Sequence, residues 1–392
     1  MSHLRTFVEL EQEALNLYKG LKDRGNDLKT KERMVIPQMD MPAQDPLVRG
    51  KNQEEVALGY TKEQAMVESL RCLQCKTAPC IKGCPVGIDI PGFLDAAAKG
   101  AFQESVDIIK KSSLLPAICG RVCPQESQCM EYCTVGKTYK DPMKAVAIGR
   151  IERYVADLER ETTEVKIPEV KEFTGFKVAI IGSGPAGLAA AADLKKEGHD
   201  VVIFEAFHKP GGVMIYGIPE FRLPKIIVEK EIDTLKAMGV KFHMNFLVGR
   251  TRTIADLINK DKFDAVFIGS GAGLPKFMNI PGENLVGVFS ANEYLTRSNL
   301  MKVYSKIKAW NSSSKTLWIR NNGSTFISQL VDTLLVTIGF ALVGIFPFDI
   351  VGSIIVTTLV VKYMAAIIDT PFLYLMNLIK PKDQVLENEK VA

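Results

Sequence analysis

The pattern of hydrophobic and polar positions divides this chain into three regions. Apolar residues fall on one helical face within Pro91–Ser113, and an acidic helix is predicted at Ile151–Glu161. Short buried strands are predicted at Lys177–Ile181 and Asp200–Phe204, and the longest apolar runs lie after Thr325. The apolar face within the first pattern consists of Phe93, Leu94, Ala97, Ala101, Val106 and Ile109. The pattern therefore predicts a helical region, an α/β region and an apolar tail.

Composition narrows the class of protein and its partners. The 392 residues are 47% hydrophobic and 24% charged, which excludes a disordered or collagen-like chain. A net charge of +4, from 49 basic and 45 acidic residues, is too small and too mixed to predict a nucleic-acid partner. Residues 1–20 mix acidic with apolar side chains and lack the apolar core of a signal peptide, so we expect the front of the chain in the cytoplasm.

All eight cysteines lie between Cys72 and Cys133. The first run has the spacing C-x2-C-x4-C-x3-C-P and ends at Cys84, and the second begins at Cys119. In a reducing compartment such crowding indicates metal ligands, and the cysteine-proline ending is typical of bacterial ferredoxin clusters. The alternatives are zinc sites, disfavoured because the second run lacks C-x2-C knuckles, and buried structural thiols, disfavoured by the segregation of all eight.

A dinucleotide-binding fingerprint follows the first predicted strand. The sequence Gly182-Ser-Gly184-Pro-Ala-Gly187 leads into an alanine-rich helix, and the next strand ends at Glu205, about twenty residues on. The glycines allow a tight turn and a close approach of backbone to a pyrophosphate, and the carboxylate would accept ribose hydroxyls. Two further glycine-rich segments, 211–225 and 263–273, predict an irregular loop and another strand beside a ligand.

Longer stretches of sequence carry a family resemblance. They are RCLQCKTAPCIKGCPVGIDIPGF, LPAICGRVCPQ, AIGRIERYVAD, VAIIGSGPAGLAAA, GGVMIYGIPEFRLPK and IPGENLVGVFSANEYLTR. From about Arg33 to Tyr304 the chain resembles the glutamate synthase small (beta) subunit family, NADPH-dependent iron-sulfur flavoproteins that include sulfide dehydrogenase and ferredoxin:NADP oxidoreductase large subunits. The resemblance implies FAD, two 4Fe-4S clusters, NADPH as donor, and an electron-accepting partner subunit, either glutamate synthase large subunit or a ferredoxin-type protein. Because the cofactors perform the redox chemistry, it implies no catalytic side chain.

The same resemblance implies ligands for each cofactor. One cluster would be bound by Cys72, Cys75, Cys80 and Cys133, and the other by Cys84, Cys123, Cys129 and Glu152, with Cys119 left as a structural thiol. The residues alone would give each cluster four cysteines, so either Cys119 or Glu152 could complete the second, and a solvated helix position is the alternative for Glu152. The implied FAD contacts are Gly182, Ser183, Gly184, Pro185, Ala186, Gly187, Glu205, Gly212, Gly217, Ile218, Arg222, Gly269 and Gly271.

The resemblance ends at Tyr304. Family members continue into a second Rossmann unit that binds NADPH and then complete the FAD domain, whereas no G-x-G-x-x-G occurs after Tyr304. We therefore expect an incomplete FAD domain, no NADPH-binding domain and an impaired oxidoreductase.

The apolar tail predicts a membrane hairpin. Phe326–Phe346 and Ile350–Ile379 are long enough to cross a bilayer, and lysines and arginines flank the hairpin but are absent from its turn, which predicts that both ends are cytoplasmic. WIRNNGSTFISQLVDTLLVTIGFALVGIFP and KYMAAIIDTPFLYLMNLI, within about 317–379, resemble the C-terminal helices of the queuosine precursor transporter family. A buried soluble hairpin, a transporter fragment and a non-functional chimera of two genes are the alternatives to an anchored oxidoreductase.

Together these inferences predict an α/β chain in five segments. They are a helical extension at 1–35, an all-helical two-cluster ferredoxin-like domain at 36–165, a truncated Rossmann-type FAD-binding domain at 174–304, a linker at 305–322 and two transmembrane helices at 323–380. The head would lie in the cytoplasm, anchored to the inner membrane, and would pass electrons from NAD(P)H through FAD and the clusters to its partner.

Overall fold

The structure is a computed structural model of the 392-residue chain. It describes residues 5–22, 24, 27–162, 167–275, 277–285, 288–301, 333–334, 337–338, 341, 347, 349–361 and 364. The chain divides into two compact units, Met1–Asn299 and Leu300–Ala392. The five predicted segments remain predictions, and the structure separates its units five residues before the predicted start of the linker at 305.

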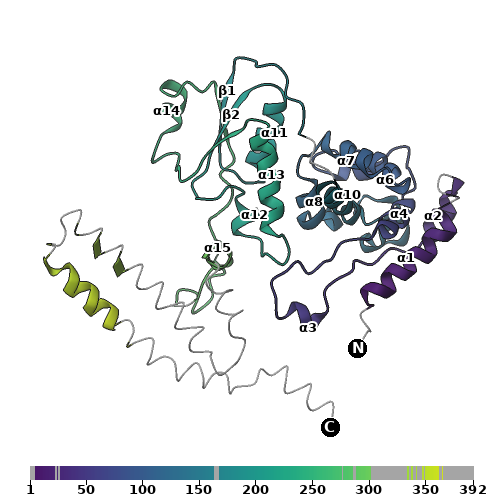
Figure 1. The fold of residues 1–392 in the computed structure, drawn as a ribbon, viewed down its shortest axis with the longest axis horizontal. Coiled ribbons are helices and arrows are strands. Elements are labelled where there is room, and N and C mark those ends of the chain that lie inside the picture. The colour runs from purple at the N-terminus through teal and green to yellow at the C-terminus, as the bar shows by residue number, and fades with distance from the viewer. Residues whose placement is uncertain are drawn as a thin grey trace, which may run out of the picture. The chain divides into compact units, whose positions relative to one another are not determined.

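Helices α1 to α10 build the first part of the first unit (Figure 1). They are α1 (Phe7–Leu21), α2 (Thr30–Val35), α3 (Pro46–Arg49), α4 (Lys62–Leu70), α5 (Pro79–Gly83), α6 (Ile90–Ala98), α7 (Phe102–Lys110), α8 (Pro116–Val122), α9 (Thr134–Tyr139) and α10 (Ile148–Thr162). Their shared core includes Phe93, Val106 and Ile151, each almost fully buried, and it also contains the thiols of Cys72 and Cys133. Cys72, Cys129 and Cys133 are therefore buried against these helices, and the other five cysteines are partly exposed.

The apolar pattern of Pro91–Ser113 forms two helices, α6 and α7. Gly100 separates them, with φ at +75°, a conformation that glycine adopts without a steric penalty. The backbone N–H of Ala101 donates to the carbonyl of Ala96 at 2.9 Å, which closes the end of α6. The predicted apolar face survives the turn, because Phe93 on α6 and Ile109 on α7 are both buried.

A four-stranded parallel sheet forms the second part of this unit, with strand order β3-β2-β1-β4. Its elements are β1 (Lys177–Ile181), α11 (Pro185–Lys196), β2 (Asp200–Phe204), α12 (Val213–Tyr216), α13 (Lys225–Ala237), β3 (Lys241–His243), α14 (Ile254–Asn259), β4 (Ala265–Ile268) and α15 (Ala291–Met301). The fingerprint strands are where the sequence predicts them. The mixed α/β class with a parallel sheet is confirmed.

Strand β1 has packed neighbours on both faces. Ala179 joins Phe204 and Leu257 in a core cluster on one face, while a Cβ added to Gly187 of α11 would lie 3.3 Å from Ile180 on the other. Such two-sided burial is typical of parallel sheets in doubly wound folds. Because β1 pairs with β2 on one side and β4 on the other, a crevice is expected outside the carboxyl ends of β1 and β4, where such folds bind nucleotides.

A buried ion pair joins the helical part to the sheet part. Arg160 on α10 lies 3.4 Å from Glu231 on α13, and the backbone N–H of Val56 donates to the carbonyl of Phe221 at 2.9 Å. Burial raises the pKa of Glu231 to about 7 although Arg160 opposes the shift. The folded protein therefore holds a proton on Glu231 between about pH 4.5 and about pH 7, where the unfolded chain releases it.

Stability from this site should fall as pH rises through that window. We expect Glu231→Gln, which removes the buried charge, to gain stability over the wild type on the order of 2 kcal/mol at about pH 8 and little at about pH 5. Arg160 keeps Asp157 as a partner at 3.3 Å in the variant. Thermal unfolding of both proteins at the two pH values measures the difference, with exposed Glu229→Gln on the same helix as control. A gain that does not change with pH would contradict the role of Glu231.

The predicted membrane hairpin is not supported by the part of the chain that the structure describes. Most of Phe326–Phe346 and much of Ile350–Ile379 lie outside the described residues, and among those described no helix combines the length and apolarity of a membrane span.

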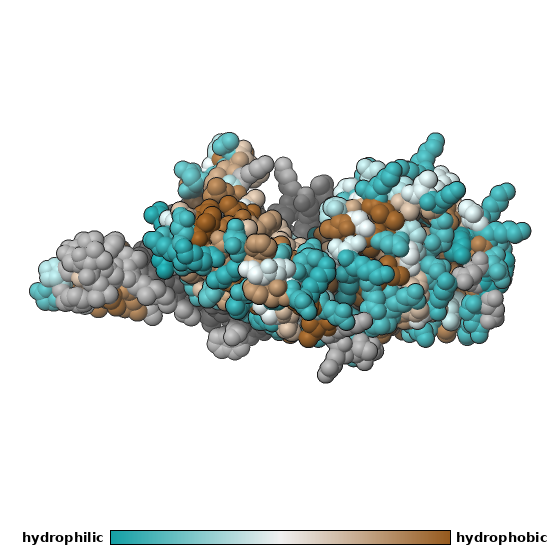
Figure 2. Space-filling view, turned by 90° about the horizontal axis from the view of Figure 1, so that it is seen from above, coloured by the Kyte–Doolittle hydropathy of each residue, from teal (hydrophilic) through white to brown (hydrophobic). Residues whose placement is uncertain are grey.

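Apolar side chains are also exposed at the end of the sheet part. Ile268 on β4 is 58% exposed and Leu274 after it is 91% exposed. Figure 2 shows hydrophobic patches within a largely hydrophilic surface on the face that it draws. Strand β4 is thus more exposed to solvent than β1, although the two strands are paired along their length.

Candidate cofactor sites

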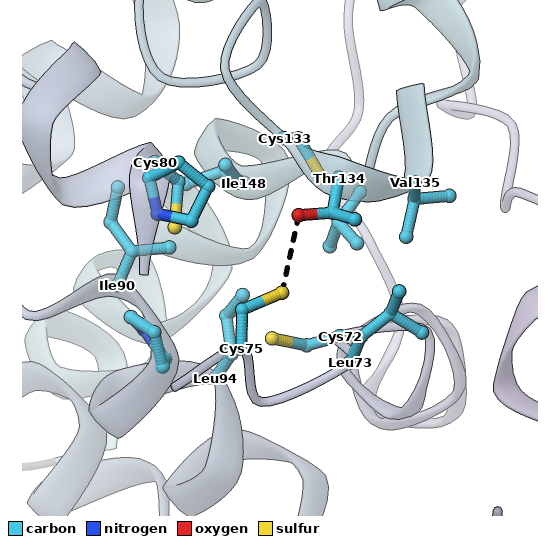
Figure 3. A pocket seen from close by; sticks show the side chains of 13 residues that line it. Cys72, Leu73, Cys75, Cys80, Ile90, Leu94, Cys133, Thr134, Val135 and Ile148 are labelled. Atoms are coloured by element: carbon cyan, nitrogen blue, oxygen red, sulfur yellow. Dashed lines mark hydrogen bonds between the residues drawn. The ribbon is translucent and has the colours of Figure 1, made fainter. Parts of the chain in front are cut away.

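Four thiols surround one cavity in the helical part. It is lined by Cys72 and Cys75, which follow α4, by Cys80 on α5, and by Cys133, which precedes α9. Figure 3 shows their sulfur atoms facing a common space, with Cys75 hydrogen-bonded to Thr134 at 3.2 Å. These are the four cysteines that the sequence assigns to one cluster, and the fold brings them together.

The walls of this cavity are otherwise apolar. Ile90 and Leu94 of α6 and Val135 of α9 complete much of the lining. Burial raises the pKa of Cys72 to about 12 and that of Cys80 to about 11, and the neighbouring thiols add to both shifts. Such thiols stay protonated at neutral pH unless a cation stabilises the thiolates. A metal cluster supplies that positive charge, so the donor set fits one.

The remaining predicted ligands form a second group around α10. Cys84 follows α5, Cys123 follows α8, and Cys129 lies just beyond a short 3-10 turn at Gln125–Ser127. Burial is the main cause of the raised pKa of Cys129. Glu152 of α10 and the thiols of Cys84 and Cys123 add to this shift. Cys80 therefore belongs to the first group and Cys84 to the second, although the two are neighbours in sequence. Cys133 and Cys129 are divided in the same way. In two-cluster ferredoxins, too, the last cysteine of a run binds the other cluster.

Glu152 is the unusual member of the second group. It is 5% exposed, and its Oε1 has no hydrogen-bond partner among the described residues. Burial raises its pKa to about 8. Buried polar atoms are nearly always paired, so an unpaired carboxylate oxygen beside cysteines fits a ligand for a bound metal group. The alternative of an ordinary solvated helix position for Glu152 is wrong, because the side chain is buried.

Cys119 lies close to the same group. Burial raises its pKa to about 12, with further contributions from Glu152 and Cys123 and an opposing one from Ser113. Cys123 is 2.8 Å from Oε1 of Gln128. Within the described part of the chain, no three His, Cys, Asp or Glu side chains are grouped closely enough to hold a single metal ion.

The fingerprint loop follows β1 and lies against the residues that follow β4. Gly182 has φ at +97°, and a Cβ there would lie 2.4 Å from the carbonyl oxygen of Gly269. A Cβ on Gly187 would lie 2.0 Å from the carbonyl oxygen of Gly182, so two glycines are required by close backbone contacts. Gly184, the N-cap of α11, has nothing described within 4 Å of its would-be Cβ. The loop therefore leaves open space at the start of α11, where a helix N-terminus favours an anion.

Glu205 at the end of β2 is bound to this loop. Its Oε2 accepts hydrogen bonds from the backbone N–H of Ser183 at 2.9 Å and from the Ser183 hydroxyl at 2.5 Å, and Oε1 accepts from the N–H of Phe207 at 2.8 Å. Each carboxylate oxygen has two lone pairs, so Oε1 can accept a further donor such as a ribose hydroxyl. Ser183 is buried, and its Oγ accepts from the N–H of Gly211 at 2.9 Å.

The loop after β2 reaches the same place. Gly212 has φ at +51°, and a Cβ there would lie 2.7 Å from Cα of Gly184. Of the other predicted flavin contacts, Pro185 and Ala186 are exposed in the first turn of α11, Gly217 and Ile218 follow α12, Gly269 and Gly271 follow β4, and Arg222 is exposed. The structure thus gathers the fingerprint, Glu205, Gly212 and Gly269 at one end of the sheet.

Two side chains that the sequence did not single out shape the 213–224 loop. The buried ammonium of Lys225 donates to the carbonyls of Met214 at 3.0 Å and Leu223 at 3.2 Å, and also to that of Ile218. The side-chain amide of Asn299 donates to the carbonyls of Tyr216 at 2.8 Å and Ile218 at 3.1 Å. No motif marks either residue, although a lysine ending a proline-rich loop is a weak signal.

Two protein-family models match the helical part and the sheet part separately. The family model described as dihydropyrimidine dehydrogenase domain II, 4Fe-4S cluster, matches residues 49–164, which include all eight cysteines and Glu152. The model described as pyridine nucleotide-disulphide oxidoreductase matches residues 176–315. A third model, of proposed vitamin uptake transporters, matches residues 294–376, where the sequence also resembles a transporter family.

About two thirds of this chain is homologous to glutamate synthase small chains. The glutamate synthase [NADPH] small chain of Azospirillum brasilense is 33% identical over 70% of this chain and 56% of its own length. That of Escherichia coli K12 is 35% identical over 66% and 54%. The NAD-dependent dihydropyrimidine dehydrogenase subunit PreT of Escherichia coli K12 is 38% identical over 57% and 54%. The predicted resemblance to this family of oxidoreductases is confirmed, and the chain spans about half the length of these curated relatives.

A solved structure also shares sequence with part of the chain. Mycobacterium tuberculosis FprA in complex with NADPH is 29% identical over 31% of this chain and 28% of its own, with a TM-score of 0.28. That score is too low to indicate a common overall fold.

Proposed function

We propose that this chain is an electron-transferring iron-sulfur flavoprotein of the glutamate synthase small-chain type. One 4Fe-4S cluster would be held by Cys72, Cys75, Cys80 and Cys133, and the other by Cys84, Cys123, Cys129 and Glu152. When bound, FAD would accept a hydride from NADPH and the clusters would carry single electrons onward. The printed names of the Azospirillum and Escherichia relatives support NADPH as donor. The proposed acceptor is a partner subunit, either a glutamate synthase large subunit or a ferredoxin-type protein.

The separation of the cysteines into two spatial groups carries this proposal. Seven cysteines and one buried carboxylate divide into a cavity lined by four thiols and a second group that includes the unpaired Oε1 of Glu152. The buried Oε1 of Glu152 favours this residue as the fourth ligand, because no hydrogen bond among the described residues satisfies it. Cys119, which also lies near Cys123 and Glu152, is the alternative.

At the flavin site, the chain's own groups would bind and orient the dinucleotide. The N-terminus of α11 and the open space beside Gly184 suit the pyrophosphate, and Oε1 of Glu205 suits a ribose hydroxyl. Lys225 and Asn299 fix the carbonyls of the neighbouring loop, so the wall of this site is held by side chains and not only by the sheet.

Metal and flavin analysis of anaerobically purified full-length chain tests the proposal. We expect a brown protein with about eight irons and about eight acid-labile sulfides per chain. Heat should release a yellow flavin, and dithionite should bleach that flavin before denaturation, whereas NADPH should reduce it slowly because no second G-x-G-x-x-G follows Tyr304. A colourless, zinc-loaded protein would overturn the cluster assignment, and a brown protein that never holds flavin would overturn the FAD assignment.

The location of the chain is a separate proposal. We propose a cytoplasmic cluster and flavin region, supported by eight free cysteines that suit a reducing compartment. The membrane hairpin stays a prediction, favoured by its apolar sequence and by the transporter model matched at residues 294–376. An anchored chain should remain in the membrane pellet after a carbonate wash. Recovery of the whole chain in a detergent-free supernatant would contradict the membrane hairpin.

A further inference from the structure

Helices α8 and α10 touch through a glycine at the second cysteine group. A Cβ added to Gly120 would lie 2.5 Å from the backbone nitrogen of Arg153 and 2.7 Å from its Cα. Contacts this short to backbone cannot be relieved by rotating a side chain, so the helices could not cross here with any other residue at 120. Gly120 follows Cys119, and Arg153 follows Glu152, so the crossing point joins the two segments that carry predicted ligands.

A network of two arginines and two carboxylates surrounds this crossing. Arg121 lies 2.8 Å from Glu55 and 2.7 Å from Asp157, and Arg153 lies 3.1 Å from Glu55 and 3.4 Å from Asp157. The arginine side chains are only 4% and 6% exposed. Arg121 also donates to the carbonyl of Ala117 at 3.0 Å within α8. The planar guanidinium of Arg121 therefore binds α8 to α10 and to the segment before α4 in one fixed geometry.

The crossing and the network together fix where the carboxylate of Glu152 lies. Glu152 is one residue from Arg153, and its buried Oε1 has no hydrogen-bond partner among the described residues. Moving α8 away from α10 by the width of a methyl group would move Cys123, which ends α8, away from Glu152. A ligand set gathered from separate helices is sensitive to displacements of this size.

We propose that Gly120 and Arg121 are positioning residues for the second cluster: Gly120 sets the α8–α10 distance, and Arg121 fixes it, so that Glu152 and Cys123 can bind the same cluster. Neither residue touches the cluster itself. This inference rests on the proposed function, in which Cys84, Cys123, Cys129 and Glu152 hold that cluster.

Gly120→Ala in the full chain tests whether the close approach of α8 to α10 is needed for the second cluster. We expect iron to fall from about eight to about four per chain, with loss of the second cluster's EPR signal after dithionite reduction. The first cluster's signal and the bound flavin should remain. Gly20→Ala in α1 is the matched control, because nothing described lies within 4 Å of a Cβ at that helix position. A Gly120→Ala protein that keeps all its iron and both signals would overturn the role of Gly120.

Arg121→Lys tests the network and remains informative if Gly120→Ala does not fold. Lysine keeps the charge but cannot bridge Glu55 and Asp157 with a planar fork. We expect a changed EPR line shape and a shifted midpoint potential for the second cluster alone, with exposed Arg49→Lys as control. An unchanged second cluster would overturn the role of Arg121. Failure of the proposed function is distinguishable, because it would appear as missing iron in the wild-type chain before any variant is made.

Discussion

Cys129→Ala and Cys133→Ala are expected each to remove one cluster, and to remove different ones. The two cysteines are four positions apart, yet they belong to different groups. Cys133 lines the cavity shared with Cys72 and Cys80, whereas Glu152 and Cys84 contribute to the raised pKa of Cys129. Each variant should therefore fall from about eight irons to about four. Loss of a cluster also removes its contribution to folding.

EPR spectroscopy of the reduced proteins distinguishes the two variants. Cys129→Ala should keep the signal that Cys133→Ala loses, and the reverse should hold for the other signal. Cys119→Ala is the matched control, because that thiol lies beside the second group but is not among its proposed ligands, and it should keep about eight irons. If Cys119→Ala loses a cluster while Glu152→Ala keeps both, Cys119 and not Glu152 is the fourth ligand.

The features predicted from sequence are those that depend on neighbours along the chain. The fingerprint glycines, the strands on either side of α11 and the position of Glu205 at the end of β2 follow from spacing alone, because one βαβ unit contains all of them. Five of the six residues of the predicted apolar face of Pro91–Ser113 are buried, and the exception is Ala101, which lies between α6 and α7. Its break at Gly100 was missed because glycine is tolerated within a helical pattern, and only the positive φ shows the turn.

The features that sequence could not give depend on partners far apart in the chain. Glu68 and Arg71 form a buried pair at 2.6 Å on α4, just before Cys72. Glu68 also accepts from the backbone N–H of Met39 at 2.7 Å and of Ala147 at 2.8 Å, which brings three distant segments together. Nothing in a run of charged residues on a helix tells which carboxylate will be buried in this way.

Glu152 shows the same limit at the site itself. Its assignment as a ligand came from the family resemblance, because a glutamate in an acidic helix is ordinarily a solvated residue. What the sequence does not show is the close packing of α8 against α10 at Gly120 and the burial of the Glu152 carboxylate on α10. Burial of a single side chain is therefore decided by helix packing, and the helical pattern leaves it open.

Gly182→Ala is expected to abolish flavin binding and to destabilise the sheet part of the chain. The backbone at 182 has φ at +97°, which L-residues rarely adopt, and the new Cβ would lie 2.4 Å from the carbonyl oxygen of Gly269 at the end of β4. Strain and overpacking together should cost about 2–4 kcal/mol. Thermal unfolding measures that loss, and flavin released from the purified protein measures the binding.

Gly184→Ala separates binding from stability at the same loop. Its φ is −69°, and nothing described lies within 4 Å of the new Cβ, so the fold should tolerate alanine. The methyl group would instead occupy the open space at the start of α11, where the pyrophosphate is proposed to lie. Overpacking of about 1–3 kcal/mol there weakens flavin binding by about tenfold or more, since 1.4 kcal/mol is a factor of ten.

Gly273→Ala is the control for both variants, because it also has open space around the new Cβ among the described residues but lies outside the predicted flavin contacts. It should leave flavin content and melting temperature unchanged. Equal flavin affinity in Gly184→Ala and Gly273→Ala would show that the dinucleotide does not approach the start of α11. A Gly182→Ala protein that melts like the wild type would show that β1 and β4 can separate at this end without cost, in which case the close contact at Gly269 does not define the site.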